Sequence, residues 1–155
     1  MNPLITSTEV AALAFGSSPE SNLEYISESA IVTAQEKFIR PVVGAALYEK
    51  LEQGDYATLL DEHLKPALAH YVRYLILPSI ASQVGSIGVI QGRGPNFSAV
   101  SSQTLKALCR RARADATTLM RRAVRHIENS LSEYPEYSPA ENVLKRVSIE
   151  ADIVL

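Results

Sequence analysis

The sequence predicts an all-α fold, a helical bundle that includes a kinked central helix, one long amphipathic helix and a glycine-rich projecting loop. Three observations support this. Apolar residues recur three and four positions apart through most of the chain. Helix-start signals of the Ser/Thr-x-x-Glu type and prolines suited to a first helical turn recur along it. Strand and helix patterns do not alternate, which argues against a parallel α/β fold.

Start and stop signals divide the chain into seven predicted helices. Capping boxes open the first two, at Thr6-x-x-Glu9 and Ser21-x-x-Glu24. Asp55 can cap the fourth helix through its side chain. Glycines stop the first and third helices. The predicted helices span residues 8–15, 21–40, 42–53, 55–63, 66–83, 103–132 and 139–146.

Prolines set several of these boundaries. The residue before a proline is disfavoured in the α region, so the second helix should end near Arg40. Pro41 then suits the first turn of the third helix, and Pro66 that of the fifth. Pro78 lies inside the fifth helix. It should kink that central helix, because it removes a backbone donor and clashes with the preceding turn.

The predicted loop covers residues 85–97 and holds four of the seven glycines. A short extended ribbon at 87–91 is the alternative within it. Its order, Gly-x-x-Gly-x-x-x-Gly-x-Gly-Pro, fits neither the dinucleotide fingerprint nor the P-loop. We therefore expect a flexible or partner-ordered loop rather than a phosphate site. Residues 1–147 are predicted to form a single domain, and residues 148–155 an extended arm.

Composition narrows the function classes. The chain has 155 residues, 46% hydrophobic and 21% charged, which excludes a chain disordered throughout. Its single cysteine, Cys109, excludes an intrachain disulfide and a cysteine-rich zinc site. No stretch reaches the ~18 apolar residues of a membrane helix, and the first residues lack a secretory pattern. We expect a protein of the reducing cytoplasm that does not enter membranes.

The formal net charge of -2 conceals three blocks of opposite sign. Residues 1–64 hold ten acids and three bases, and residues 65–125 hold ten bases and one acid. Residues 126–155 hold six acids and two bases. A near-neutral total therefore does not exclude a strongly charged surface.

Most of the basic block falls on the predicted long helix, over about half of its wheel and opposite an apolar stripe. Three interpretations stay open: a solvated or internally paired face, a nucleic-acid surface, and a contact between the basic face of one copy and the acidic face of the next. A head-to-tail contact of the last kind closes into a ring when the rotation permits. The face consists of Lys106, Arg110, Arg111, Arg113, Arg121, Arg122 and Arg125.

Candidate catalytic and metal-binding residues are few. His63 and His70 are seven residues apart, wider than usual metal-ligand spacing, and a surface or packing role is favoured. Cys109 lies within the apolar stripe of the long helix, which favours a small buried residue over a nucleophile. His126 lies at the edge of that stripe without a serine or aspartate clearly placed for a triad. We predict no enzyme activity, cofactor or metal.

Two stretches of sequence carry a family resemblance. Residues 37–51 and 129–137 resemble a group of small helical proteins from phages and prophages of Bacteroides-like bacteria. That group is similar to the head–tail connector (adaptor, or neck ring) proteins of tailed bacteriophages. None of the motif's residues is a typical catalytic group, and their spacing indicates packing. The motif comprises Phe38, Ile39, Pro41, Gly44, Leu47, Tyr48 and Leu51.

The resemblance implies a structural role in virion assembly. Copies would form a ring between portal and tail, in contact with portal and tail-completion proteins. Non-specific contact with DNA is a further expectation. The protein would then occur in the host bacterial cytoplasm during assembly and afterwards in the virion. The alternative is a small helical nucleic-acid-binding or regulatory protein that uses the arginine face.

Overall fold

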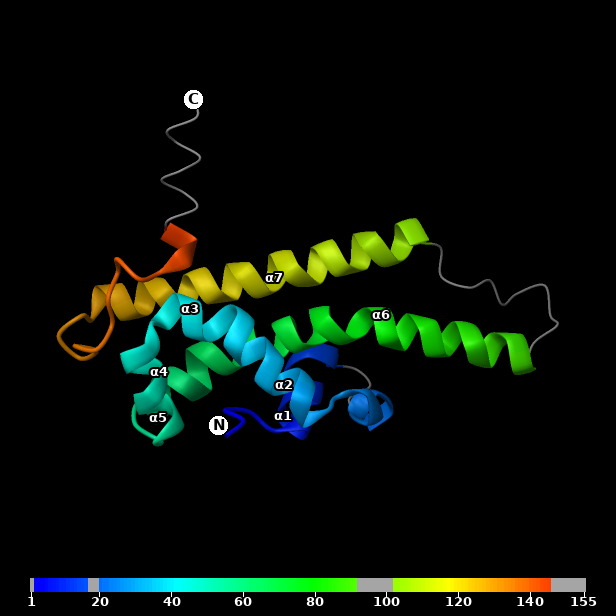
Figure 1. Cartoon of the computed structure of the whole chain (residues 1–155), viewed down its shortest axis with the longest axis horizontal. Coiled ribbons are helices and arrows are strands. Elements are labelled where there is room, and N and C mark those ends of the chain that lie inside the picture. Colours follow the sequence, from blue (N-terminus) through cyan, green and yellow to red (C-terminus); the bar gives the residue numbers. More distant parts are fainter. Residues whose placement is uncertain (1, 17–19, 92–101, 146–155) are drawn as a thin grey trace, which may run out of the picture.

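The computed structural model describes residues 2–16, 20–91 and 102–145, and every regular element within them is helical (Figure 1). The predicted all-α fold is confirmed. η1 is a 3₁₀ helix, whereas η2 and η3 are π-helical turns. In chain order the elements are α1 (Ser7–Phe15), η1 (Glu20–Tyr25), α2 (Glu28–Ala34), η2 (Gln35–Ile39), α3 (Arg40–Val43), α4 (Ala45–Glu52), α5 (Ala57–Leu59), η3 (Leu60–Leu64), α6 (Lys65–Gln91) and α7 (Ser102–Asn129).

Helix α6 is the central element. It packs against α7 along one side and against α1 and α2 on others. Helices α6 and α7 run antiparallel, and their adjoining ends extend past the shorter helices (Figure 1). We call this projecting part, residues 78–91 and 102–111, the hairpin tip. In the described part of the chain, no helix combines the length and apolar character needed to cross a membrane.

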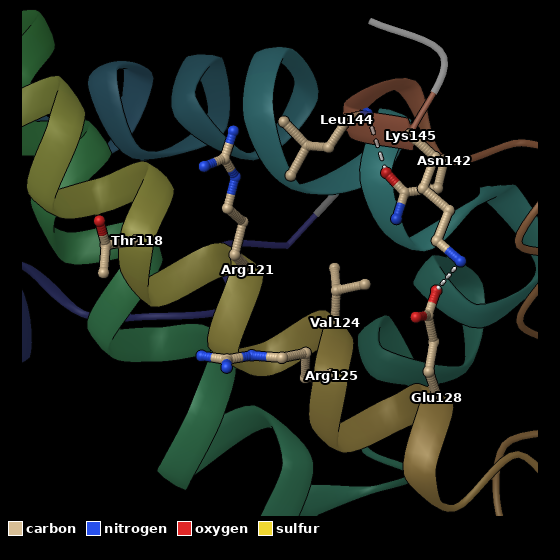
Figure 2. A pocket seen from close by; sticks show the side chains of 8 residues that line it. All are labelled: Thr118, Arg121, Val124, Arg125, Glu128, Asn142, Leu144 and Lys145. Atoms are coloured by element: carbon tan, nitrogen blue, oxygen red, sulfur yellow. Dashed lines mark hydrogen bonds and ion pairs between the residues drawn. The ribbon is translucent and has the colours of Figure 1, made fainter. Parts of the chain in front are cut away.

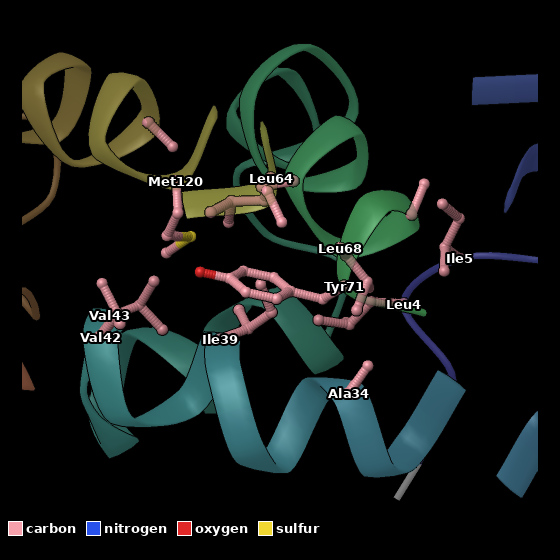
Figure 3. Close-up of a cluster of buried hydrophobic side chains, with 14 of the residues drawn as sticks. Leu4, Ile5, Ala34, Ile39, Val42, Val43, Leu64, Leu68, Tyr71 and Met120 are labelled. Atoms are coloured by element: carbon pink, nitrogen blue, oxygen red, sulfur yellow. The ribbon is translucent and has the colours of Figure 1, made fainter. Parts of the chain in front are cut away.

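The core lies between α6, α7 and the helices from α2 to α4 (Figure 3). Leu64 of η3 and Leu68 and Tyr71 of α6 face this core and are almost fully buried. Met120 enters it from α7 with no exposed surface, and Ile39 from η2 likewise. Each large apolar side chain buried here contributes about 1.5–3 kcal/mol through removal from water.

The first capping box is confirmed and the second is wrong. The Glu9 amide donates to Thr6 Oγ1 at 3.2 Å, and the Thr6 amide donates to the Glu9 carboxylate at 2.8 Å. No α-helix starts at the Ser21 box. Helix α2 starts after Ser27, whose Oγ accepts from the Ala30 amide at 3.1 Å. Ile26 and Ile31 are both buried on either side of this cap, the positions of a hydrophobic staple.

The predicted helix end at Arg40 is also wrong. The chain passes through Pro41 by way of η2 and breaks at Gly44, whose φ is +85°. The Arg40 amide reaches back five residues to the Gln35 carbonyl. This wider turn relieves the clash between the Pro41 ring and the preceding turn.

A π-helical turn also precedes Pro66. The predicted break between His63 and Pro66 is absent, and α5, η3 and α6 form one continuous helical run. A π turn again ends two residues before the proline. Asp55 does not cap this run. It pairs with Lys50 at 3.3 Å, and Tyr56 takes the N-cap position with a φ of 58°.

Helix α6 is longer than predicted. It continues to Gln91, so residues 85–91 are helical rather than a loop or ribbon. A glycine destabilises a helix by only about 1 kcal/mol relative to alanine. The other residues of this segment can therefore keep it helical. Pro78 lies inside α6, and the kink expected there stays a prediction. Residues 92–97 of the predicted loop lie outside the described residues.

The structure differs from the predictions in two places, at the ends of α7 and in the segment after it. Helix α7 begins at Ser102 and ends at Asn129, three residues earlier than predicted. The helix predicted at 139–146 is wrong: residues 139–141 form a turn and residues 143–145 a single helical turn. The buried Asn142 interrupts the helix, because its side chain accepts from the Leu144 amide at 2.9 Å. The predicted arm, 148–155, lies outside the described residues.

Candidate interaction surface

The basic side chains of α7 form an exposed face. All seven predicted face residues are exposed, and none forms an ion pair with another described residue. Four cations elsewhere in the described chain do have carboxylate partners: Arg40, Lys50, Lys65 and Lys145. Internal pairing of the arginine face with the acidic blocks is therefore not seen within the described residues.

The opposite side of α7 explains why the cations face outward. The predicted apolar stripe is buried over the second part of the helix, where the helix packs on α6. The buried stripe residues are Ala112, Ala116, Met120, Ala123 and Ile127. The stripe is not buried at the hairpin tip: Leu105 and Cys109 are half-buried, and Leu108 is 41% exposed.

Three open hollows follow one another along α7. The first holds about 500 Å³ and is lined by Thr118, Arg121 and Arg125 together with Asn142 and Lys145 (Figure 2). The second, about 390 Å³, shares Thr118 and Arg121 with the first. The third, about 500 Å³, shares two arginines with the second. It is lined by Tyr74, Pro78, Leu105, Lys106, Cys109, Arg110 and Arg113.

We call this continuous row of hollows the α7 trough. Its character changes along its length. The end near Arg125 is polar, whereas the hairpin-tip end has apolar walls from Tyr74, Leu105 and Cys109 under a basic rim. Arg113 lies over the Tyr74 ring at 6.0 Å, which orients its guanidinium across the hollow. The trough can accept a chain that is both apolar and acidic.

A polar network fixes the segment after α7 against the helix. Asn142 has no exposed surface and donates to the Tyr137 hydroxyl at 2.8 Å. That hydroxyl donates to Glu128 of α7 at 3.0 Å, and Lys145 pairs with the same carboxylate at 2.7 Å. Burial, with the Glu128 contact, raises the pKa of Tyr137 to about 12. The network places residue 145 beside the polar end of the trough.

The motif residues behave as the packing interpretation predicts. Ile39, Leu47, Tyr48 and Leu51 are almost fully buried. Phe38 stacks on Tyr71 of α6 with ring centroids 4.3 Å apart. None of these side chains lines one of the three hollows along α7. The motif therefore supports the body of the fold and does not contribute to the trough.

Gly44 has two reasons to be glycine. Its φ of +85° and ψ of 158° are accessible essentially to glycine alone. A β-carbon at this position would also lie 2.9 Å from the Glu141 carboxylate of the segment after α7. The neighbour that comes this close is a side chain from the far end of the chain.

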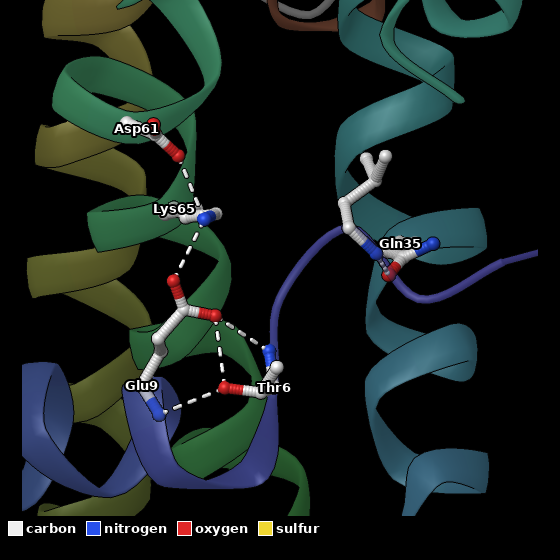
Figure 4. A network of polar contacts seen from close by, with 6 residues as sticks. Thr6, Glu9, Gln35, Asp61 and Lys65 are labelled. Carbon is white, nitrogen blue, oxygen red and sulfur yellow. Dashed lines mark hydrogen bonds and ion pairs between the residues drawn. The ribbon is translucent and has the colours of Figure 1, made fainter. Parts of the chain in front are cut away.

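Gln35 is a structural residue that the sequence interpretation missed. It is fully buried, accepts from the Leu4 amide at 2.8 Å and donates to the Tyr48 hydroxyl at 2.9 Å. Lys65 makes a second link to the first residues of the chain, because it pairs with both Glu9 and Asp61 at 2.7 Å (Figure 4). A glutamine among apolar positions of a helix was the only sequence signal for the first link.

All three histidines lie at half-buried positions. His63 stacks on His126 with ring centroids 3.9 Å apart, and His126 Nε2 lies 3.2 Å from the Tyr134 hydroxyl. Burial and the neighbouring His126 lower the pKa of His63, and burial lowers that of His70. No group of three or more metal-ligating side chains occurs within the residues that the structure describes.

Comparison with known proteins gives one match. Residues 34–147, more than half of the chain, match the profile of DUF6712, a family of unknown function. The chain belongs to the DUF6712 family. No curated protein and no solved structure matches it. The DUF6712 segment starts at the end of α2 and contains the motif, the α6–α7 hairpin and the network around Asn142. Helix α1 and η1 precede it and are attached to it through Gln35 and Lys65.

Proposed function

We propose that this DUF6712 protein is a structural subunit of a tailed-phage virion, a head–tail connector that assembles into a ring between portal and tail. The carrying observation is the exposed arginine face of α7, whose cations have no carboxylate partner among the described residues. Such a face needs a partner outside the described chain or stays solvated. The resemblance of residues 37–51 to connector-like phage proteins favours a protein partner.

The distribution of acids supports contact between copies. Glu24, Glu28 and Glu49 are exposed on η1, α2 and α4. Helix α6 lies between α7 and helix α1 of this acidic block, and η1 lies across α6 from α7 (Figure 1). A surface of one sign on one side and of the other sign on another suits a head-to-tail contact, which generates rings or filaments.

Charge reversal tests this proposal. The variant R121E/R122E/R125E should block virion assembly and ring formation while leaving the monomer folded, because all three side chains are exposed. Phage yield reports on the first effect, light scattering on the second and circular dichroism on the third. Lys37→Glu, at an exposed position outside the face, is the matched control. Normal phage yield from the triple variant would contradict a role for this face.

A second candidate is non-specific nucleic-acid binding. It is favoured by the regular recurrence of cations on one ridge of α7, at positions 106, 110, 113, 121 and 125. Several arginines on phosphates release counterions, so binding should weaken steeply as salt rises. A ring held by apolar contacts as well as ion pairs should survive moderate salt. Titration of a duplex of arbitrary sequence at two salt concentrations, beside scattering under the same conditions, separates the two.

A further inference from the structure

Among the described residues, nothing covers the apolar end of the α7 trough or pairs with the cations of its rim, and the chain carries a segment of matching chemistry. Residues 149–155 read Ile-Glu-Ala-Asp-Ile-Val-Leu. Apolar residues occupy positions 149, 151, 153 and 155, the acids Glu150 and Asp152 lie between the first three of them, and Val154 adds one further apolar residue. In an extended segment this alternation places the apolar side chains on one face and the acids on the other.

We propose that residues 149–155 dock along the α7 trough of their own chain. The apolar side chains would cover Leu105 and Cys109 at the hairpin tip. Glu150 and Asp152 would pair with the arginines on the rim. The inference concerns a contact within one chain and does not rest on the proposed function.

The position of the last described residues supports docking within the chain. Lys145 lines the polar end of the trough and is fixed there by its 2.7 Å contact with Glu128. From Glu128, the residue that Lys145 contacts, to Cys109 the helix advances about 28 Å, at 1.5 Å per residue. Ten further residues of extended chain span at most about 33–36 Å. The segment is therefore long enough to follow the trough to the hairpin tip.

Charge sets the direction in which the segment runs. Beyond the end of α7 the exposed acid Glu133 would repel Glu150 and Asp152. Toward the hairpin tip the segment instead meets Arg121, Arg113 and Arg110, none of which has an ion-pair partner among the described residues. Charge-assisted contacts to arginine are the stronger kind of ion pair available to a carboxylate.

Docking would also affect the face used in the proposed function. A segment with two acids would neutralise part of the arginine face and cover the apolar wall of the tip. A neighbouring copy or a nucleic acid would have to displace it. The free chain would then bind partners more weakly than a chain without the segment.

The single cysteine of the chain makes the contact testable. Cys109 lies in the apolar wall of the trough. In the full-length variant Ile153→Cys, which places the new thiol on the apolar face of the segment, mild oxidation should produce an intrachain disulfide with Cys109, at a rate independent of protein concentration. Mass spectrometry and non-reducing electrophoresis detect it. Val143→Cys is the matched control and should cross-link slowly, because the network around Asn142 fixes its segment at the other end of the trough.

Neutralising Glu150 and Asp152 distinguishes docking from random contact of a tethered segment. Adding E150Q/D152N to Ile153→Cys leaves α7 and the thiol of Cys109 untouched. It should slow intrachain disulfide formation by at least about fivefold, because two charge-assisted contacts are lost. An unchanged rate would overturn the proposal. An interchain disulfide whose rate rises with concentration would also overturn it, and would assign the trough to a second copy.

Discussion

The two parts of α7 have the same sequence pattern but are buried to different extents. From Ala112 to Ile127 the apolar stripe is buried where α7 packs against α6 and η3. From Ser102 to Arg111 the stripe continues, yet the structure buries none of its residues. Leu108 is 41% exposed, whereas Met120 is fully buried. An amphipathic pattern therefore shows which face of a helix can be buried, and the neighbouring elements decide where it is.

The difference divides the molecule into a body and a projecting tip. In the body, α7 has α6, η3 and the polar network around Asn142 to pack against. At the tip, the described residues comprise the two arms of the hairpin, and the hollow between them is open. An apolar stripe left over on a projecting element is typical of a surface that meets a partner.

The largest expected effect is in the body. Met120→Ala removes a fully buried side chain and should lower the free energy of unfolding by about 2–5 kcal/mol, through lost burial and the cavity that remains. Met120→Leu nearly conserves volume and should cost less than about 1.5 kcal/mol. Urea denaturation followed by circular dichroism measures both. Equal losses from the two variants would contradict close packing at this position.

The second-largest effect is expected for Gly44→Ala, which should lower the free energy of unfolding by about 1–3 kcal/mol. The variant forces a non-glycine residue into a conformation nearly restricted to glycine and places a β-carbon against Glu141. Gly54→Ala is the matched control: its φ is +90°, with open space around the new β-carbon. The difference between the two variants in urea midpoint isolates the contact with Glu141. If Gly44→Ala were no worse than Gly54→Ala, that contact would have no energetic weight.

The histidine stack gives a smaller, pH-dependent effect. The pKa of His63 is lowered in the fold, so the unfolded chain takes up its proton first as pH falls below the ordinary histidine value. Stability from this group is therefore complete above about pH 6.5 and decreases as pH falls toward the lower folded pKa. His63→Phe keeps a ring against His126. In this variant the urea midpoint should depend less steeply on pH between pH 7.5 and 5.5. An unchanged slope would assign the pH dependence to other groups.

The smallest effect on stability is expected at the tip. Leu108→Ser removes an exposed apolar side chain and should change the free energy of unfolding by no more than about 0.5 kcal/mol. The same denaturation experiment measures it. A loss above about 1 kcal/mol would show that the tip is packed in the free protein, and would remove the distinction between body and tip.

Local sequence signals predicted the fold well where they act over a few residues. The Thr6–Glu9 capping box, the stop at Gly16 and the buried stripe from Ala112 to Ile127 all follow from local rules and are present. Three of the errors, at Pro41, at Pro66 and at the end of α6, share one cause. Pro41, Pro66 and the glycines of α6 weaken a helix by modest amounts, and π turns or neighbouring residues allow it to continue.

The candidate surface was predicted in part. The seven cations of α7 could be assigned to one exposed face because they lie opposite an apolar stripe at helical spacing. The trough could not be predicted, because Tyr74 and Pro78 reach it from α6, and Asn142 and Lys145 from the segment after α7. The pairing of His63 with His126 and the burial of Gln35 likewise depend on contacts between distant parts of the chain.

By itself the sequence determined the helical class, the position of the long amphipathic helix and the separation of charge into blocks. These follow from residue spacing and side-chain chemistry, which act within a few turns. Only the tertiary structure decided how much of α7 is buried, which cations have partners and where the trough runs. Those properties depend on which surfaces the folded chain brings together, and the local pattern of α7 is the same in the buried part and at the projecting tip.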